Sequence, residues 1–139
     1  MTDVHKPDTR SFNMKQIKSR DTKPELLVRR FLHSNGFRYR LHCKQLPGKP
    51  DIILPKYNSV VFVHGCFWHA HEECTQFKLP KTNINWWKNK LYDNKLRDEE
   101  HKMKLERLGW NVFVIWECEL SNKIVNRTLF DLKMNLLNS

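Results

Sequence analysis

Three residues of the kinds that bind soft divalent metals lie within nine positions of this chain. Cys66, His71 and Cys74 form a C-x4-H-x2-C pattern, and a further thiol, Cys118, follows much later in the sequence. Thiolate and imidazole ligands together are typical of tetrahedral zinc, and four protein ligands leave no position open for a substrate. The pattern therefore predicts a structural zinc site. The alternative is a set of unrelated buried thiols beside a surface histidine.

A second group of residues has the chemistry to hydrolyse a phosphodiester. Asp51 opens a short apolar segment after a Gly-Lys-Pro turn, His64 ends the next apolar segment, and His69 follows closely. Such hydrolysis needs a divalent ion to polarise the phosphate and a base to activate water. A carboxylate oxygen suits magnesium, and histidine titrates near the pH at which a base works. The plainer alternatives are a turn aspartate and a hydrogen-bonded histidine at a strand end.

The chain carries a strong excess of positive charge. Its 139 residues include 25 Lys and Arg against 15 Asp and Glu, so the formal net charge is +10 and the pI is near 9.6. This excess favours a polyanionic partner, most often nucleic acid, over a merely solubilising surface. No apolar run reaches the ~18 residues of a membrane helix, and the first residues lack an apolar signal core. We therefore expect a cytoplasmic protein whose cysteines are thiols or metal ligands.

Patterning predicts a basic arm over residues 1–20 and a single three-layer α/β domain over 21–139. The first helix should begin at Thr22, because Thr22 and Glu25 have capping-box spacing. Cys43 falls on the apolar face of the first strand and is interpreted as a core thiol. The predicted elements are a helix from Thr22 to Asn35, strands over 37–44, 51–54 and 60–63, a charged helix over 84–108, a strand over 111–116 and an amphipathic helix over 123–137.

Several longer strings of residues resemble one enzyme family. They are Arg10-Ser11, Asn13-Met14, Arg20-Asp-Thr-Lys-Pro-Glu25, Leu46-Pro-Gly-Lys-Pro-Asp51, Val63-His-Gly-Cys-Phe-Trp-His69-Ala-His71, Leu108-Gly-Trp110 and Trp116-Glu-Cys118. Together they resemble the very-short-patch-repair (Vsr) DNA mismatch endonucleases. The predicted α-β-β-β-α-β order is that of a restriction-endonuclease-like core, here with a structural zinc loop. The resemblance implies a magnesium-dependent enzyme that nicks one strand beside a T·G mismatch, the lesion left when 5-methylcytosine deaminates.

The resemblance also implies roles for individual residues. Asp51 and the main-chain carbonyl of Val63 would bind magnesium, and His69 would be the general base or orient the attacking water. His64 and Glu25 would hold water or phosphate, although Glu25 has a second interpretation as part of the helix cap. The family's structural zinc ligands fall on Cys66, His71, Cys74 and Cys118.

Aromatic and basic residues indicate how duplex DNA would be held. Phe67, Trp68 and Trp87 would insert between base pairs, where unstacking is cheapest at a mismatch, instead of packing in the core. Trp110 and Trp116, by contrast, are interpreted as core residues. The other predicted DNA contacts are Lys90 and Asn94, which share one face of the long helix, and Arg10 and Lys15 in the arm.

Two other functions remain open at this point. One is a non-catalytic zinc module that binds distorted duplex, and the other is a restriction-type endonuclease without mismatch preference. The expected partner is double-stranded DNA with a T·G mismatch, bound by a monomer. Mismatch-repair proteins as further partners, the base context and a cognate methyltransferase are left open.

Overall fold

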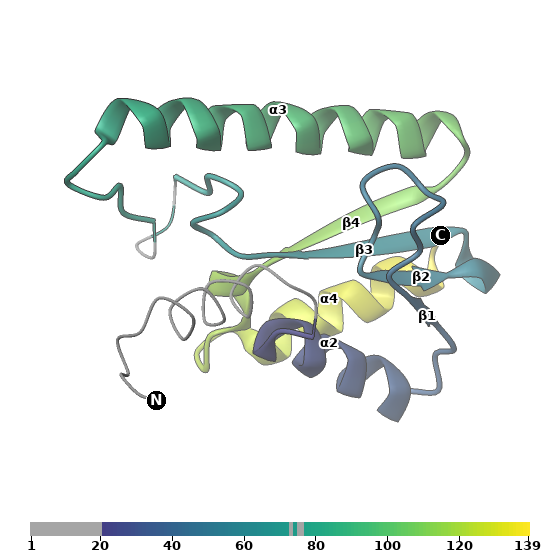
Figure 1. Ribbon diagram of the computed structural model, residues 1–139. Helices are drawn as coiled ribbons and strands as arrows, with labels where there is room; N and C mark the ends of the chain where they lie inside the picture. The colour runs from purple at the N-terminus through teal and green to yellow at the C-terminus, as the bar shows by residue number, and fades with distance from the viewer. Residues whose placement is uncertain (1–20, 73, 75–76) are drawn as a thin grey trace, which may run out of the picture.

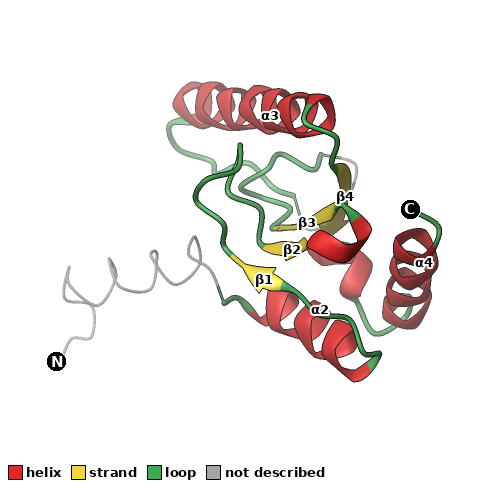
Figure 2. Ribbon diagram, turned by 90° about the vertical axis from the view of Figure 1, so that its right-hand side faces the viewer, coloured by secondary structure: helices red, strands yellow, loops and turns green. Residues whose placement is uncertain are grey.

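The computed structural model describes residues 21–72, 74 and 77–139, and these form a four-stranded sheet with helices on both faces (Figure 1). The elements are α2 (Lys23–Ser34), β1 (Arg40–Leu41), β2 (Ile52–Leu54), η1 (Pro55–Tyr57), β3 (Ser59–His64), α3 (Ile84–Arg107), β4 (Asn111–Trp116), η2 (Glu117–Leu120) and α4 (Val125–Leu137). Helix α3 covers one face, and α2 and α4 cover the other (Figure 2). The predicted element order and the mixed α/β class are confirmed. The basic arm, with Arg10 and Lys15, lies outside the described residues.

The sheet has the order β1-β2-β3-β4. Strands β2 and β3 form an antiparallel hairpin in which Ile52 pairs with Val61. Strand β4 then pairs with β3 in parallel, with Val61 opposite Phe113, because the chain returns through the long crossover helix α3. Strand β3 is covered on both faces, which explains why its sequence is a continuous apolar run instead of an alternating one.

Two apolar clusters fill the spaces above and below the sheet. The larger lies against α2 and α4 and contains Leu32, Val61 and Leu132, all buried. The smaller lies on the opposite face and includes Val60 and Leu105. Within the 24 residues of α3, only Leu91 and Leu105 are buried. Helix α3 is therefore anchored at a few points and presents most of its charged surface outward.

The first predicted strand is wrong in length. The alternation over 37–44 predicts an extended half-buried strand, but the paired segment is Arg40–Leu41, and Leu41 is 39% exposed. The backbone leaves the extended conformation at His42, whose φ is +50°. The partner strand β2 also offers only three residues for pairing. Cys43, interpreted as a core thiol, is half-buried and packs against the cluster that contains Leu105.

No helix among the described residues is both long enough and apolar enough to cross a lipid bilayer.

Candidate active site and metal cluster

A cavity of about 800 Å³ opens beside the start of α2, the end of β3 and the middle of α3. Its wall brings together residues from five separate segments of the chain. The predicted site residues that line it are Glu25, Asp51, Val63, His64, Phe67, Trp68, His69, Lys90 and Asn94. The cavity is therefore the candidate active site, while the role of each residue in it stays a prediction.

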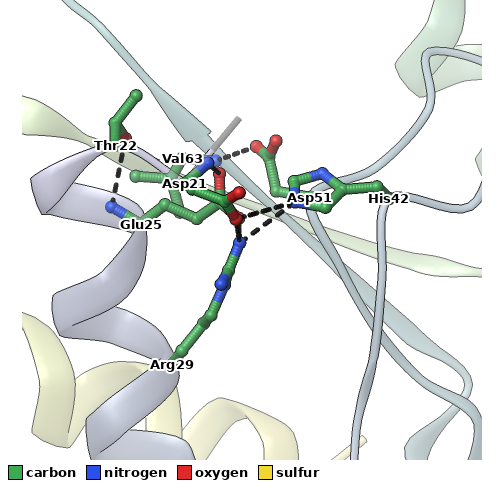
Figure 3. Close-up of polar contacts among 7 residues, drawn as sticks. All are labelled: Asp21, Thr22, Glu25, Arg29, His42, Asp51 and Val63. Carbon is green, nitrogen blue, oxygen red and sulfur yellow. Dashed lines mark hydrogen bonds and ion pairs between the residues drawn. The ribbon is translucent and has the colours of Figure 1, made fainter. Parts of the chain in front are cut away.

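Asp51 stands at the entrance of β2 and points toward the end of β3. Because the two strands form a hairpin, its Oδ2 accepts a hydrogen bond of 2.8 Å from the backbone N–H of Val63 (Figure 3). Burial raises the pKa of Asp51 to about 6, against the lowering effect of that hydrogen bond, and the nearby Glu25 carboxylate raises it further. A half-buried carboxylate with a raised pKa is a favourable ligand for a divalent cation, because the positive charge of the cation would favour the ionised form.

Glu25 serves the helix cap through its backbone and the cavity through its side chain. Its N–H donates to Thr22 Oγ1 at 3.3 Å, which confirms that Thr22 caps α2. Its carboxylate is 3% exposed, and Oε1 accepts from the N–H of Asp21 at 3.2 Å. The other oxygen, Oε2, pairs with Arg29 (Figure 3). The Thr22 half of the predicted capping box is therefore present, but the Glu25 side chain accepts from Asp21 and not from the N-cap residue Thr22. The interpretation of Glu25 as a cavity residue stays a prediction.

The two predicted catalytic histidines stack on one another. The ring centroids of His64 and His69 are 3.7 Å apart at an angle of 5°. Burial, and to a smaller extent the charge of His69, lowers the pKa of His64 to about 3, so His64 is neutral at physiological pH. Its Nδ1 is buried and has no hydrogen-bond partner among the described residues. A water molecule or a substrate oxygen would satisfy that atom.

Sequence reasoning missed one member of this group. His69 Nδ1 lies 2.6 Å from Oδ2 of Asp98, which comes from the middle of α3. Asp98 also lines the cavity, together with Lys90 and Asn94. The spacing of these three residues, four apart along a helix, places them on one face, so the signal was present in the sequence.

The four residues of the predicted zinc pattern converge below the histidines. Their ligand atoms all lie within 4.8 Å of one another, and His71 Nδ1 is 3.5 Å from Cys118 Sγ. Zinc bonds of about 2.0–2.3 Å at tetrahedral angles put ligand atoms roughly 3.3–3.8 Å apart, so the donor set and spacing suit zinc. Cys118 reaches the cluster from η2, directly after β4. Cys43 is not part of this group.

Trp116 corrects another expectation. Interpreted as a core residue, it instead stacks on His71, with centroids 4.1 Å apart at 9°. Its ring also meets the edge of His64 at 5.2 Å. The parallel register pairs His64 with Trp116 across β3 and β4, which brings the indole into this position. Trp116 therefore lies between the predicted zinc ligands and the two predicted catalytic histidines.

The predicted wedge residues form one aromatic group, of which Phe67 and Trp68 line the cavity and Trp87 does not. Phe67 contacts Trp68 at 5.0 Å and Trp87 at 5.4 Å between centroids. Asn94 donates from Nδ2 to the backbone carbonyl of Trp68 at 3.1 Å, so this predicted DNA contact also holds the aromatic loop. Lys90 is exposed and lines the same cavity. The aromatic group thus adjoins the polar residues.

Comparison with known proteins decides the family. A model of the family described as "DNA mismatch endonuclease Vsr" matches residues 2–76. This chain belongs to the Vsr family. The similarity drawn from sequence strings is confirmed.

Relatives within the Vsr family match nearly the whole chain. The type II nicking enzyme V.NmeAIP of Neisseria meningitidis serogroup A is 50% identical over 127 residues, covering 91% of this chain and 90% of the relative. The type II nicking enzyme V.XorIIP of Xanthomonas oryzae is 48% identical, covering 88% and 89%. The DNA mismatch endonuclease Vsr of Escherichia coli K12 is 42% identical, covering 88% and 78%. The chain is therefore a Vsr-type endonuclease that acts on DNA.

Proposed function

We propose that this Vsr-family endonuclease hydrolyses a phosphodiester bond of one strand beside a T·G mismatch, and so starts very short patch repair of deaminated 5-methylcytosine. The observation that carries the proposal is that Asp51, the His69–Asp98 pair, Phe67 and Trp68 line one cavity. Hydrolytic residues and a potential base-pair wedge then meet the same stretch of duplex. The E. coli relative is named as a mismatch endonuclease, and this supports the mismatch as substrate.

His69 is the proposed general base. An ionised carboxylate only accepts hydrogen bonds, so Asp98 holds the proton on Nδ1 of His69 and leaves Nε2 with its lone pair. That atom would take the proton from the attacking water or orient it. Stacking on the neutral ring of His64 restricts the orientation of His69. His64 and Glu25 would hold water or a phosphate oxygen at the cavity wall.

Asp51 and the main-chain carbonyl of Val63 are the proposed magnesium ligands. When bound, Mg²⁺ would polarise the scissile phosphate and supply charge for its transition state. Asp51 contributes a half-buried carboxylate whose Oδ2 accepts a hydrogen bond from the Val63 N–H. Magnesium commonly takes one or two carboxylates and completes its shell with water and phosphate oxygens, so an apolar residue suffices at position 63.

Zinc has a structural role in this proposal. Cys66, His71, Cys74 and Cys118 would hold it in a closed site that joins the aromatic loop to η2. This restraint matters because Phe67 and Trp68 directly follow Cys66. The restriction-endonuclease-like fold, with this zinc loop added, is compatible with the observed sheet and helices.

The wedge and the basic surface together would hold the duplex. Phe67, Trp68 and Trp87 would enter the stack at the mismatch, where unstacking costs least. Phosphate contacts would come from Lys90 and Asn94, and from Arg10 and Lys15 in the arm. The protein would act as a monomer in the cytoplasm, and mismatch-repair proteins would be further partners rather than a requirement for cutting.

A strand-specific nicking assay with magnesium tests the proposal. T·G-mismatched and fully paired duplexes with varied flanking bases would be compared, with Asp51→Ala as the inactive control. We expect mismatch-dependent nicking of one strand that the variant loses while it retains DNA affinity. Equal cutting of paired DNA would favour a restriction-type nicking role, which the names of two relatives also suit. Binding without any cutting would indicate a non-catalytic module.

A further inference from the structure

The cavity that would receive the scissile phosphate is lined by more carboxylates than Lys and Arg side chains. The acidic residues are Asp21, Glu25, Asp51, Asp98 and Glu117, and the basic ones are Lys23, Lys49, Lys90 and Arg97. A phosphodiester is itself an anion, so each unpaired carboxylate near it opposes its binding. Positive side chains in the cavity therefore matter for a phosphate substrate, and among these four only Lys90 has a role in the proposed function.

Lys49 is the basic residue of this set that stands closest to Asp51 along the chain. The two are separated only by Pro50, whose side chain is fully buried and whose ring fixes the backbone φ angle. Strand β2 begins directly after Asp51, at Ile52. One short turn therefore delivers both the proposed magnesium ligand and a positive side chain to the same cavity.

This turn is held in place by close contact with helix α3. Gly48 and Lys49 both have left-handed backbone conformations, with φ of +76° and +48°, and the N–H of Lys49 donates to the carbonyl of Leu46 at 3.1 Å. A Cβ atom at position 48 would lie 2.9 Å from Cβ of His101, so only glycine lets the turn approach α3 this closely (Figure 1). The position of Lys49 is thus set by the same helix that carries Asp98.

Folding alone does not explain a lysine at position 49. A left-handed φ is unfavourable for a residue with a Cβ, and glycine or asparagine would adopt it more easily. The Lys49 side chain is exposed, and its ammonium has no ion-pair or hydrogen-bond partner within the part of the chain that the structure describes. Backbone strain of this kind is concentrated at functional sites, where the side chain serves the function instead of stability.

We propose that Lys49 is a catalytic residue whose ammonium contacts a non-bridging oxygen of the scissile phosphate. The attacking water bonds to phosphorus and gives its proton to His69, the bond to the leaving oxygen breaks, and that oxygen takes a proton from solvent. Lys49 transfers no proton in this step. It stabilises negative charge on the phosphate oxygens through a charge-assisted hydrogen bond, from a turn that is already in position before DNA binds. The proposal rests on the proposed hydrolysis of a phosphodiester.

Single-turnover nicking of mismatched duplex by full-length, zinc-loaded protein with magnesium is the first test. We expect kcat to fall about 100-fold or more in Lys49→Gln, with KM for DNA nearly unchanged. Lys49→Arg keeps the charge and should recover most of the rate. Lys49→Gly suits the left-handed backbone, so its Tm should equal or exceed that of wild type while its kcat falls as in Lys49→Gln. The matched control is Lys44→Gln, an exposed lysine of the same loop that does not line the cavity.

DNA binding gives a second readout that does not depend on activity. The affinity for mismatched duplex would be measured by fluorescence anisotropy over a range of salt concentrations, without magnesium. Loss of one phosphate contact in Lys49→Gln should reduce the slope of log K against log salt by about one. A duplex with a neutral methylphosphonate at the scissile position should reduce the wild-type slope by the same amount. The two changes combined should reduce it no further, because they remove the same contact.

The outcomes separate this proposal from the proposed function. An unchanged kcat in folded Lys49→Gln would overturn the proposal, and so would slope changes that simply add when the variant meets the methylphosphonate duplex. A fall in kcat that Lys49→Arg does not restore would also contradict a role for the charge. Wild-type protein that nicks no duplex would refute the proposed hydrolysis. Methylphosphonates placed in turn at each phosphate beside the mismatch would then decide whether Lys49 contacts phosphate without catalysing its cleavage.

Discussion

His69 and Asp98 form a direct 2.6 Å contact between the aromatic loop and helix α3. The two residues are 29 positions apart, and both line the cavity that contains Asp51. Both side chains are about one-third exposed or less, so the pair is shielded from water only in part. The contact occupies Nδ1 of His69, and the proposed role of His69 as a general base depends on the tautomer that this contact favours.

Replacing Asp98 with Asn should lower the nicking rate while leaving DNA affinity unchanged. The amide can donate to Nδ1 of His69 and so favour the tautomer in which Nε2 carries the proton, which disables that atom as a base. We expect kcat to fall at least about tenfold, with the Kd for mismatched duplex within error of wild type. Single-turnover nicking and fluorescence anisotropy measure the two quantities. Asp93→Asn, on an exposed part of the same helix, is the matched control; an equal loss there would assign the effect to helix charge.

Replacing Asp51 with Asn should stabilise the magnesium-free protein at neutral pH. Burial raises the pKa of Asp51 from its ordinary 3.8 to about 6, so between these pH values the folded chain binds more protons than the unfolded chain. Stability contributed by this group therefore falls as pH rises from about 4 to 6 and stays reduced above that range. Asparagine does not ionise, so the variant does not lose this unfolding free energy, which amounts to at most about 3 kcal/mol in wild type. Its side-chain oxygen can still accept the hydrogen bond from the Val63 N–H.

Urea unfolding at pH 4 and pH 7.5, without added magnesium and with zinc retained, checks this expectation. The difference in unfolding free energy between Asp51→Asn and wild type should be larger at pH 7.5. Comparing the two proteins also cancels the effect of His64, whose lowered pKa of about 3 acts in the opposite direction, since its stability contribution falls as pH drops below the ordinary 6.5. If Asp51→Asn is less stable than wild type at pH 7.5, the ionised Asp51 carboxylate does not destabilise the folded protein, and the prediction is wrong.

Much of the fold follows from local patterns in the sequence. The Thr22 cap, the hairpin of Ile52–Leu54 with Ser59–His64, and the long helix each have a sequence signal within a few residues, and each forms close to its predicted bounds. The hairpin alone brings Asp51 to Val63, so this part of the cavity is also predictable from spacing. Sequence patterns within a few residues are therefore sufficient to predict elements and contacts formed by residues that are close in the sequence.

The contacts that sequence reasoning missed are all long-range. Asp98 reaches His69 only because α3 crosses over the sheet, and the intervening loop has no periodicity that would set this distance. Trp116 ends an apolar strand, and this pattern in the sequence is typical of a core residue. Its position beside His64 depends on the parallel register of β3 and β4, which the sequence does not indicate. Arg29 looks like any charged helix residue until the turn at His42, with its positive φ, brings the imidazole onto it.

Replacing Cys118 with Ser should release zinc and destabilise the protein. Cys118 is the one predicted zinc ligand from outside the 66–74 segment, so its loss should disconnect that segment from η2. We expect zinc content to fall well below one ion per chain and the Tm to drop by at least about 5 °C. Elemental analysis and calorimetry measure these changes. Cys43→Ser, a thiol outside the cluster, should retain its zinc. A Cys118→Ser protein with full stability and activity would rule out a structural metal.

Replacing Trp68 with Ala should reduce discrimination between mismatched and paired duplex more than it reduces general affinity. The indole contacts Phe67 and Trp87, and the backbone of Trp68 is fixed by Asn94, so the ring is already positioned before DNA binds. A stacking contact contributes about 1–3 kcal/mol, which corresponds to a loss of roughly five- to a hundredfold in the affinity ratio. This ratio would be measured by anisotropy at several salt concentrations, because phosphate contacts depend on salt and stacking depends on it much less.

The matched control for this prediction is Tyr92→Ala, which removes an aromatic ring that is 61% exposed on helix α3 and does not line the cavity. It should leave the ratio unchanged. Equal losses of affinity for both duplexes in Trp68→Ala would mean that Trp68 supports binding without selecting the mismatch. Selection would then have to come from polar contacts near Asn94 and Lys90, and Asn94→Ala would be expected to show the larger change in ratio. The two variants therefore separate a wedge from a polar reader of the same lesion.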